Sequence, residues 1–378
     1  MKLYIPFFFP IHIQMENGDQ MVGMNSSNSV SIVKTPAFKV WIGLIIFAVI
    51  EVILIFLLEP LLRINFPPLN PDMGPEDYYW KLNVRDTLTM IITWTFYAAH
   101  QFSVWIVIVW AHKNYHGKKL DEKKLLAYTT MMTFILVGFT LLHLLQTQLW
   151  YDGLAQDVAI LTSQGSVIIM LSILLVMQNP KRGLFFGKKE KKLMRPEVSA
   201  TFMKSHQLIF SWALVYTFWF HPMDSSPALL SGFFFMALLF IQMVLAYTRM
   251  HLNKWWVLIV ESYVAIHATI VAIAQWVDFG SNPPMWAMFL LGFLAMLIFT
   301  YIHGLGLPNW LRWSIVIAYF VFMVFVYVPQ PFGFGRDFAY FLRLEFLWIP
   351  IILFLIAFIA AAIAHVYVLI RDRKSSSN

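Results

Sequence analysis

The chain has no cysteine and few charged residues. The absence of cysteine excludes disulfides, thiolate metal sites, iron–sulfur clusters and thiol catalysis. Only 12% of the 378 residues are charged, whereas 60% are hydrophobic and the mean hydropathy is +0.68. A water-soluble domain of this size does not have such a composition. The sequence therefore predicts an all-α polytopic integral membrane protein.

Several familiar catalytic signatures are also missing. The sequence contains no HExxH, GxSxG, Walker A, GxGxxG or clustered-histidine desaturase motif. No lysine lies in the middle of a predicted span to carry retinal. Ser163 and Ser166 could be paired with His143, but "TSQGS" offers no acidic residue at the same depth, which does not favour a serine hydrolase. No basic patch is interleaved with exposed aromatics, so nucleic-acid binding is not expected.

Long apolar stretches dominate what remains. A spanning helix needs about 20 apolar residues. We expect about ten transmembrane helices, in the ranges 38–58, 87–111, 125–149, 158–178, 202–221, 229–249, 255–277, 285–304, 309–328 and 346–370. The predicted organisation is a polar cytoplasmic segment 1–36, a single helical membrane domain 37–371 and a short cytoplasmic tail 372–378.

Lysine and arginine are distributed unevenly between the predicted loops. The basic loops 112–124, 181–195 and 249–254 and the C-terminal tail all fall on one face if the spans alternate. Because basic short loops resist translocation, this face is predicted to be cytoplasmic, with both termini inside, in a multi-pass protein of the cell membrane. The net charge of +7 then reflects topology and attraction to anionic lipids of the bilayer.

Polar residues at three depths supply the candidate sites. The outer one follows from "LLHLLQTQLWYDGLAQD", residues 141–157, because His143 and Gln146 share a helix face about 10 Å below the loop. The predicted cofactor-binding residues are His143, Gln146, Gln164 and His221, below Asp152, Asp157 and Asp224. Imidazoles can hold a transition metal or haem iron while amides orient them. Alternatively, His143 and Gln146 form a hydrogen-bonded pair that joins the predicted helices 125–149 and 158–178.

The middle depth carries Glu51, His100 and His267, which we predict to be catalytic residues. Glu51 is the one carboxyl in an otherwise apolar helix, "GLIIFAVIEVILIFLL". At such a depth a carboxyl must be protonated, paired or bound to a cation. The three residues could form a facial metal triad or a proton-conducting chain, or they could simply join helices.

Further histidines lie toward the cytoplasmic face. The predicted metal ligands are His206, His251 and His303, together with His143 and His221. His206 and His221 are fifteen residues apart and about 60° out of register on one helix, a partial match to a helix that binds two stacked haems. No second helix repeats the pair, so a symmetrical di-haem bundle is not supported, whereas a single haem, for instance between His143 and His221, is possible. The alternative is that His251 and His303 bind the last carbonyls of their helices.

Two functions follow from these residues. One is a membrane oxidoreductase or metalloenzyme with a His-ligated haem b or non-haem transition metal, acting on a lipophilic substrate or quinone. The other is a transporter, or a proton-translocating subunit of a membrane complex, in which Glu51, Glu261 and histidines relay protons. The sequence has eight intramembrane histidines but only two intramembrane carboxylates. Because a proton relay usually needs carboxylates, these numbers favour the oxidoreductase or metalloenzyme.

Overall fold

The computed structural model describes residues 35–66, 85–115, 122–280 and 284–376. These ranges form helices and no β-strand. The α-helices are α1 (Pro36–Asn65), α2 (Thr87–Tyr115), α3 (Glu122–Trp150), α4 (Ile160–Arg182), α5 (Pro196–Phe218), α6 (Pro227–Val244), α7 (Lys254–Phe279), α8 (Trp286–Phe299), α9 (Asn309–Tyr327), α10 (Phe338–Leu342) and α11 (Trp348–Ser376). Short 3-10 turns are η2 (Leu154–Gln156), η3 (Tyr301–Gly304) and η4 (Glu345–Leu347).

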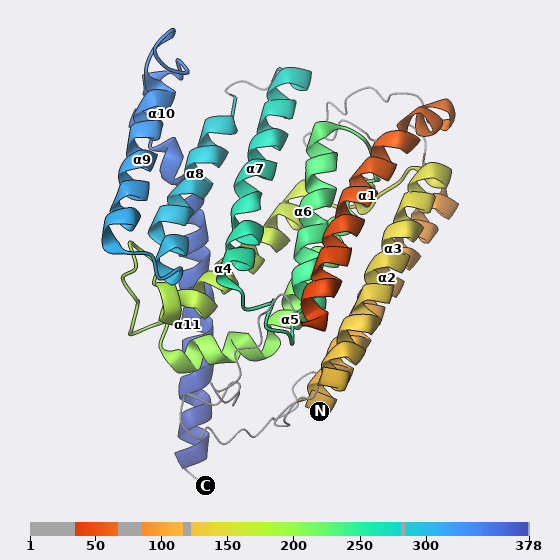
Figure 1. Cartoon of the computed structure of the whole chain (residues 1–378), viewed down its shortest axis with the longest axis horizontal. Coiled ribbons are helices and arrows are strands. Elements are labelled where there is room, and N and C mark those ends of the chain that lie inside the picture. The colour runs from red at the N-terminus through yellow and green to blue at the C-terminus, as the bar shows by residue number, and fades with distance from the viewer. Residues whose placement is uncertain (1–34, 67–84, 116–121, 281–283, 377–378) are drawn as a thin grey trace, which may run out of the picture.

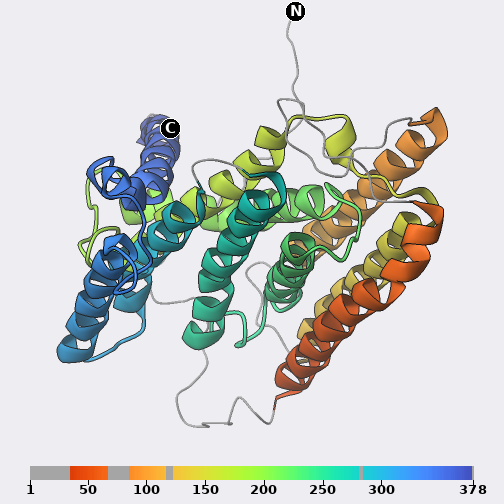
Figure 2. The same ribbon diagram turned by 90° about the horizontal axis from the view of Figure 1, so that it is seen from above.

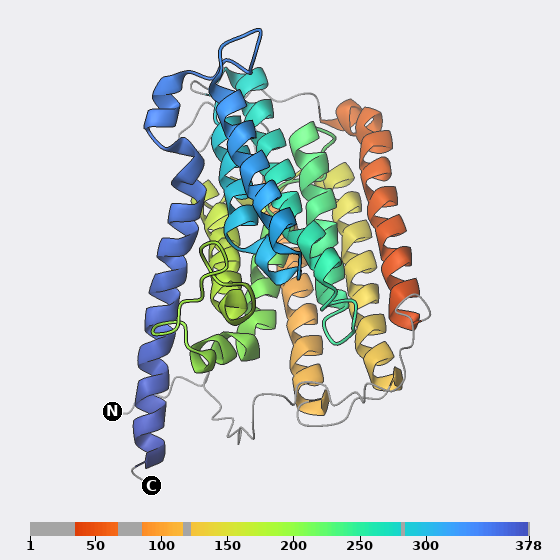
Figure 3. The same ribbon diagram turned by 60° about the vertical axis from the view of Figure 1, so that its left-hand side comes forward.

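The long helices stand side by side in one bundle (Figure 1). Helices α9 and α11 lie at one edge, and α1, α2 and α3 lie at the other, as the view from above also shows (Figure 2). The last turns of α11 extend beyond the bundle at the end where α1 begins (Figure 3). We call this the basic end, because the described loops 183–195 and 245–253 lie there, and the other the opposite end.

Nine helices within the described ranges are long and apolar enough to cross a membrane. The prediction of ten was wrong for residues 202–221. They fall in α5, which is not among the nine because its first half contains Lys204, His206 and Gln207. This half of α5 lies across the basic end instead of along the bundle (Figure 1). The other nine predicted spans each match one of the nine helices.

Helix boundaries follow local chemistry. The side chains of Thr35, Ser226 and Asn253 accept backbone N–H groups at the starts of α1, α6 and α7. Such oxygens satisfy donors that a first helical turn leaves unpaired. Gly280 ends α7 in the left-handed conformation that glycine adopts without a steric penalty. The predicted segment 1–36 lies almost wholly outside the described residues, so the predicted division into segments stays a prediction.

Helix α1 buries a single narrow stripe. Its buried residues are Leu44, Ala48, Glu51, Ile55 and Leu62, at spacings that place them on one helix face. The helix packs against α6 and α3, whereas large side chains elsewhere on it, such as Phe56 and Leu57, are more than half exposed. An exposed apolar surface of this kind suits contact with lipid. Glu51 therefore faces protein and lies near the midpoint of α1.

Candidate functional site

The polar stretch 141–157 forms the last turns of α3 and the loop that follows. His143 is fully buried, and its Nδ1 lies 3.0 Å from Gln146 Oε1. Its Nε2 lies 3.0 Å from the backbone oxygen of His221, and its ring packs on Trp219 with centroids 4.3 Å apart. Both ring nitrogens thus face oxygen acceptors. A doubly protonated ring donates to both, whereas a neutral ring donates to one.

Gln146 extends these contacts to the neighbouring helix. Its Nε2 donates to Thr93 Oγ1 of α2 at 3.3 Å and to the backbone oxygen of Asp152 at 3.2 Å. The Asp152 carboxylate is fully buried and accepts from Arg85 at 3.0 and 2.7 Å, from Thr93 at 3.1 Å and from the Gly153 N–H at 2.8 Å. We call Arg85, Thr93, His143, Gln146 and Asp152 the Asp152 network.

The loop after α3 pairs with the turn between α5 and α6. The N–H groups of Leu154 and Ala155 donate to the carbonyls of Trp219 and Phe220, each at 3.0 Å. A Cβ on Gly153 would lie 2.5 Å from the Phe220 oxygen, so only glycine permits this approach. Hydrogen bonds of the polar stretch therefore hold two loops and three helices together at the opposite end.

Two arginines at this end each bind two carboxylates: Arg85 binds Asp152 and Asp157, and Arg63 binds Glu59 and Asp224. Burial raises the pKa of the Asp152 carboxyl, and this effect outweighs the lowering by Arg85. Arg85 also donates to Asp157, which accepts the Trp94 indole N–H at 2.6 Å. In the next loop Asp224 accepts from Arg63 and Tyr151, the latter at 2.7 Å. Each of the three loop aspartates thus has a basic partner.

These contacts bear on the predicted cofactor-binding residues. The His143–Gln146 hydrogen bond is present, but it ties α3 to α2 and to the α5–α6 turn, not to α4. Gln164 is exposed on α4 and lies outside this network. His143 Nε2 meets the His221 backbone, not its ring. No group of three His, Asp or Glu side chains in the described ranges could hold a metal ion, so the haem and metal roles stay predictions.

The predicted middle residues have different surroundings. Glu51 is 3% exposed, and its Oε2 has no hydrogen-bond partner among the described residues. His100 is 1% exposed, stacks on Phe139 at 4.3 Å between centroids, and accepts the Trp219 indole N–H at 3.1 Å through Nδ1. His267 instead pairs with Ser231 at 3.0 Å. Nothing in the geometry gathers the three residues into one triad.

Further unpartnered polar atoms lie on α2, the helix of His100, and on α3. With Nδ1 of His100 accepting, a neutral ring carries its proton on Nε2, which has no acceptor within the described chain. The neighbouring Gln101 is buried with neither end of its amide bonded, and Thr140 of α3 is buried with an unpartnered hydroxyl. Helix α3 packs against both α1 and α2. Buried polar groups are nearly always hydrogen-bonded, so each of these exceptions requires an explanation.

Histidines at the basic end contact backbone carbonyls. His251 Nδ1 lies 2.9 Å from the oxygen of Gln242, and His303 Nε2 lies 3.1 Å from that of Ile298. Those carbonyls belong to the last turns of α6 and α8, which confirms the capping alternative. Burial lowers the pKa of His251. His206 Nδ1 lies 2.8 Å from the Met203 oxygen within α5.

Two buried ion pairs were not predicted. Arg182 donates to both carboxylate oxygens of Glu261 at 2.6 and 2.9 Å, and its guanidinium lies over the Tyr301 ring. Glu261 is therefore a paired residue and not a free relay group. Arg336, in the loop between α9 and α10, and Glu345 of η4 make a second bidentate pair. A basic residue at a helix end beside "KKEKK" resembles a topology signal, and nothing in the sequence marks Arg182 as buried.

Comparisons with protein-family models, with curated proteins and with solved structures found no match to this chain. Its function is therefore inferred from the placement of its own residues.

Proposed function

We propose that this protein is a multi-pass protein of the cell membrane that carries protons across the bilayer, as a transporter or as a translocating subunit of a membrane complex. Glu51 is the residue that binds the proton. The observation that carries the proposal is a buried carboxyl with an unpartnered oxygen, Glu51 Oε2, in the middle of an apolar spanning helix.

The position of Glu51 suits a carrier of charge. It lies about 22 Å along α1 from its first residue and about 21 Å from its last, by the rise of an α-helix. An isolated carboxylate is costly there, so the side chain is stable when protonated or beside a cation. Protonation and deprotonation at mid-membrane are the elementary steps of proton transfer, and intramembrane carboxyls frequently mark such routes.

Unpartnered polar groups on the helices next to α1 support a route for protons along α1, α2 and α3. His100 and Gln101 on α2 and Thr140 on α3 have unpartnered groups. Helix α3 packs directly against α1, and α2 packs against α3. At both ends of the bundle, in contrast, buried charges are bonded to each other, as in Arg85–Asp152 and Arg182–Glu261. Groups that must exchange partners with water or protons cannot be permanently satisfied by the protein.

The alternative function, a haem or metal oxidoreductase, gains no comparable support. Both ring nitrogens of His143 are used by Gln146 and the His221 carbonyl. His251 and His303 are likewise bonded to carbonyls. One contact of His143 would have to break before its ring could coordinate a metal, whereas His251 and His303 each use only one ring nitrogen for a carbonyl. No three His, Asp or Glu side chains in the described ranges come together as a metal site around any of them.

Proton flux tests the proposed function. The purified protein is reconstituted into liposomes that contain a pH-sensitive dye, and a potassium diffusion potential is imposed with valinomycin. We expect the internal pH to change faster than in protein-free liposomes, with a direction that reverses with the sign of the potential. A rate equal to that of protein-free liposomes contradicts the proposal.

Orientation gives a separate prediction. Single cysteines at two exposed positions, Lys189→Cys in the basic loop and Ala159→Cys at the start of α4, are unambiguous labels because the natural chain has no cysteine. If the basic loops are cytoplasmic, an impermeant maleimide added to intact cells should label Cys at position 159 and not at 189. Labelling of both positions in intact cells, or of 189 alone, would overturn this orientation.

A further inference from the structure

Two cavities lie next to each other between α8, α9 and the start of α11, at the edge of the bundle away from α1 and Glu51 (Figure 1). The first, of about 110 Å³, is lined by Phe186, His303, Asn309, Arg312, Trp313 and Val316. The second, of about 350 Å³, is lined by apolar side chains and Tyr319. Phe186 lines both cavities. The smaller cavity, which has His303, Asn309 and Arg312 in a partly apolar lining and which we call the polar cavity, thus adjoins a larger apolar cavity.

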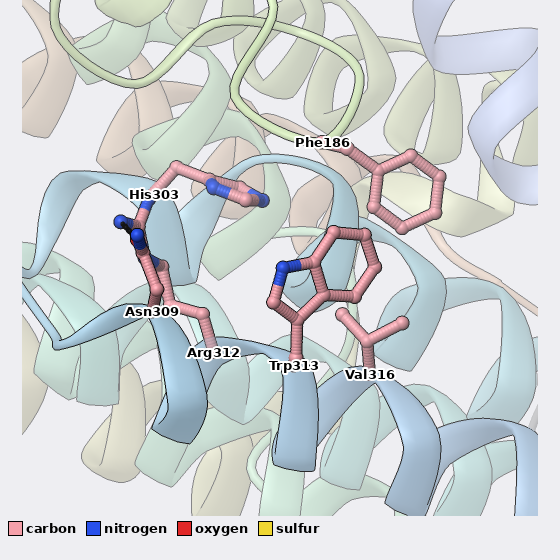
Figure 4. Close-up of a pocket in the computed structure, with 6 residues that line it drawn as sticks. All are labelled: Phe186, His303, Asn309, Arg312, Trp313 and Val316. Carbon is pink, nitrogen blue, oxygen red and sulfur yellow. Dashed lines mark hydrogen bonds between the residues drawn. The ribbon is translucent and has the colours of Figure 1, made fainter.

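The polar cavity has the chemistry of an anion site. Figure 4 shows His303, Asn309 and Arg312 on one side of it, Phe186 and Val316 on the other, and the Trp313 indole between them. The Arg312 guanidinium donates to Asn309, but its Nε is buried without a partner, and no carboxylate in the described ranges pairs with it. Guanidinium groups bind phosphate oxygens strongly.

Backbone donors reinforce this charge. Helix α9 begins at Asn309, inside the cavity wall, and no side chain caps it. The first N–H groups of a helix lack intrahelical acceptors and favour an anion. The adjoining loop carries an excess of positive charge, from Lys188, Lys189, Lys191, Lys192 and Arg195 against Glu190.

That loop is held in place by its own contacts. Asn179 donates to the backbone oxygens of Glu190 and Met194 at 2.7 and 3.2 Å. Burial alone would raise the pKa of the Glu190 carboxyl, but N–H donors from residues 192 to 194 outweigh it and lower the pKa. Gly187, at φ +77°, packs against the His303 ring, where a Cβ would lie 2.8 Å from Nδ1. Phe186 is therefore fixed between the two cavities.

The apolar cavity identifies the ligand class. Its walls include Phe299 and Phe354, and it opens past Phe320 and Ile351, which are 42% and 53% exposed. Trp310 and Trp313, in the first turns of α9, are 70% and 60% exposed. Exposed tryptophans mark the level of lipid headgroups. An acyl chain fits the second cavity when its headgroup occupies the first.

We propose that these cavities form a binding site for an anionic phospholipid of the leaflet at the basic end, with its phosphate at Arg312 and an acyl chain beside Phe186 in the apolar cavity. The ligand must contain both a phosphate and an acyl chain. The polar cavity alone would also accept free phosphate, and the apolar cavity alone would accept any lipid. The cation at Arg312 makes the site selective for a net negative headgroup.

Native mass spectrometry of the detergent-solubilised full chain tests this site. The probes are dioleoyl phosphatidylglycerol, dioleoyl phosphatidylcholine and glycerol phosphate. We expect phosphatidylglycerol to be retained about tenfold more strongly than phosphatidylcholine, and Arg312→Gln to remove this preference. Arg371→Gln, which removes an exposed charge from the last turns of α11, is the matched control and should bind as the wild type does.

Each remaining outcome decides the proposal. Equal retention of the two lipids, or unchanged retention in Arg312→Gln, overturns it. Displacement of phosphatidylglycerol by an equal concentration of glycerol phosphate shows a free-phosphate site and also overturns it. Ile351→Trp, at an exposed wall of the apolar cavity, provides a second variant that leaves the charge intact. It should weaken retention of dioleoyl phosphatidylglycerol, and unchanged retention would exclude the apolar cavity as the chain site.

Discussion

Glu51→Gln should abolish proton flux in proteoliposomes while leaving the protein folded. Glutamine has nearly the same shape as a protonated glutamic acid, so the packing of Glu51 between Ala48 and Ile55 in the α1 stripe is preserved. It cannot release a proton, however. We expect the flux driven by an imposed potential to fall to the rate of protein-free liposomes.

A matched control separates this effect from a general loss of charge. Glu197→Gln removes a carboxylate whose side chain is 45% exposed in the first turn of α5. It should leave the flux unchanged. Glu51→Leu removes the acid as well and is expected to be as stable as the wild type or more stable, because an unpartnered polar group in the bundle is replaced by an apolar one. Wild-type flux in Glu51→Gln would refute the role of Glu51.

Asp152→Ala is expected to cause the largest loss of stability. The substitution leaves Arg85, which is only 14% exposed, without its buried partner and leaves Thr93 without an acceptor. Removing one member of a buried ion pair costs about 3 to 5 kcal/mol. Arg85 retains Asp157, so the loss should lie near the lower limit. Thermal unfolding in detergent, followed by tryptophan fluorescence, measures it.

Two further variants test the cause of that loss. Asp157→Ala removes a carboxylate that is 23% exposed and should cost about 1 kcal/mol or less. The double variant Arg85→Gln with Asp152→Ala should recover part of the stability lost in Asp152→Ala, since it removes the guanidinium that has lost its buried carboxylate and leaves only the more exposed Asp157 without its cation. A double variant less stable than Asp152→Ala would show that Arg85 is stabilised by other groups.

The membrane bundle was largely predictable from the sequence. Nine of the predicted ranges match helices because unbroken apolar stretches have few other stable structures. Residues 202–221 were mispredicted because the apolar second half of α5 was extended over Lys204, His206 and Gln207, which make the first half too polar for a span. The predicted span 285–304 ends where η3 ends, at the glycines and proline of "HGLGLPNW", although α8 itself ends earlier, at Phe299.

The sites were less predictable, because partners depend on tertiary contacts. His143 and Gln146 were correctly placed on one face, since i and i+3 positions meet within a helix. Their other partners come from distant segments: Thr93 lies 53 residues from Gln146, and His221 lies 78 residues from His143. Depth alone likewise grouped Glu51 with His267, although α1 and α7 place them among different neighbours. A histidine in a membrane helix can bond a carbonyl as readily as a metal, and sequence does not distinguish these.

The most direct measurement of the central claim is infrared difference spectroscopy of the purified protein in lipid during a stepwise change of pH. A protonated carboxyl buried in an apolar site gives a C=O stretching band that is resolved from the carboxylate and amide bands. If Glu51 binds and releases the transported proton, this band should disappear as the pH is raised, shift when the sample is in deuterium oxide, and be absent from Glu51→Gln. A wild-type spectrum without such a band, or a band that persists in Glu51→Gln, would contradict the assignment of Glu51 as the proton-binding group.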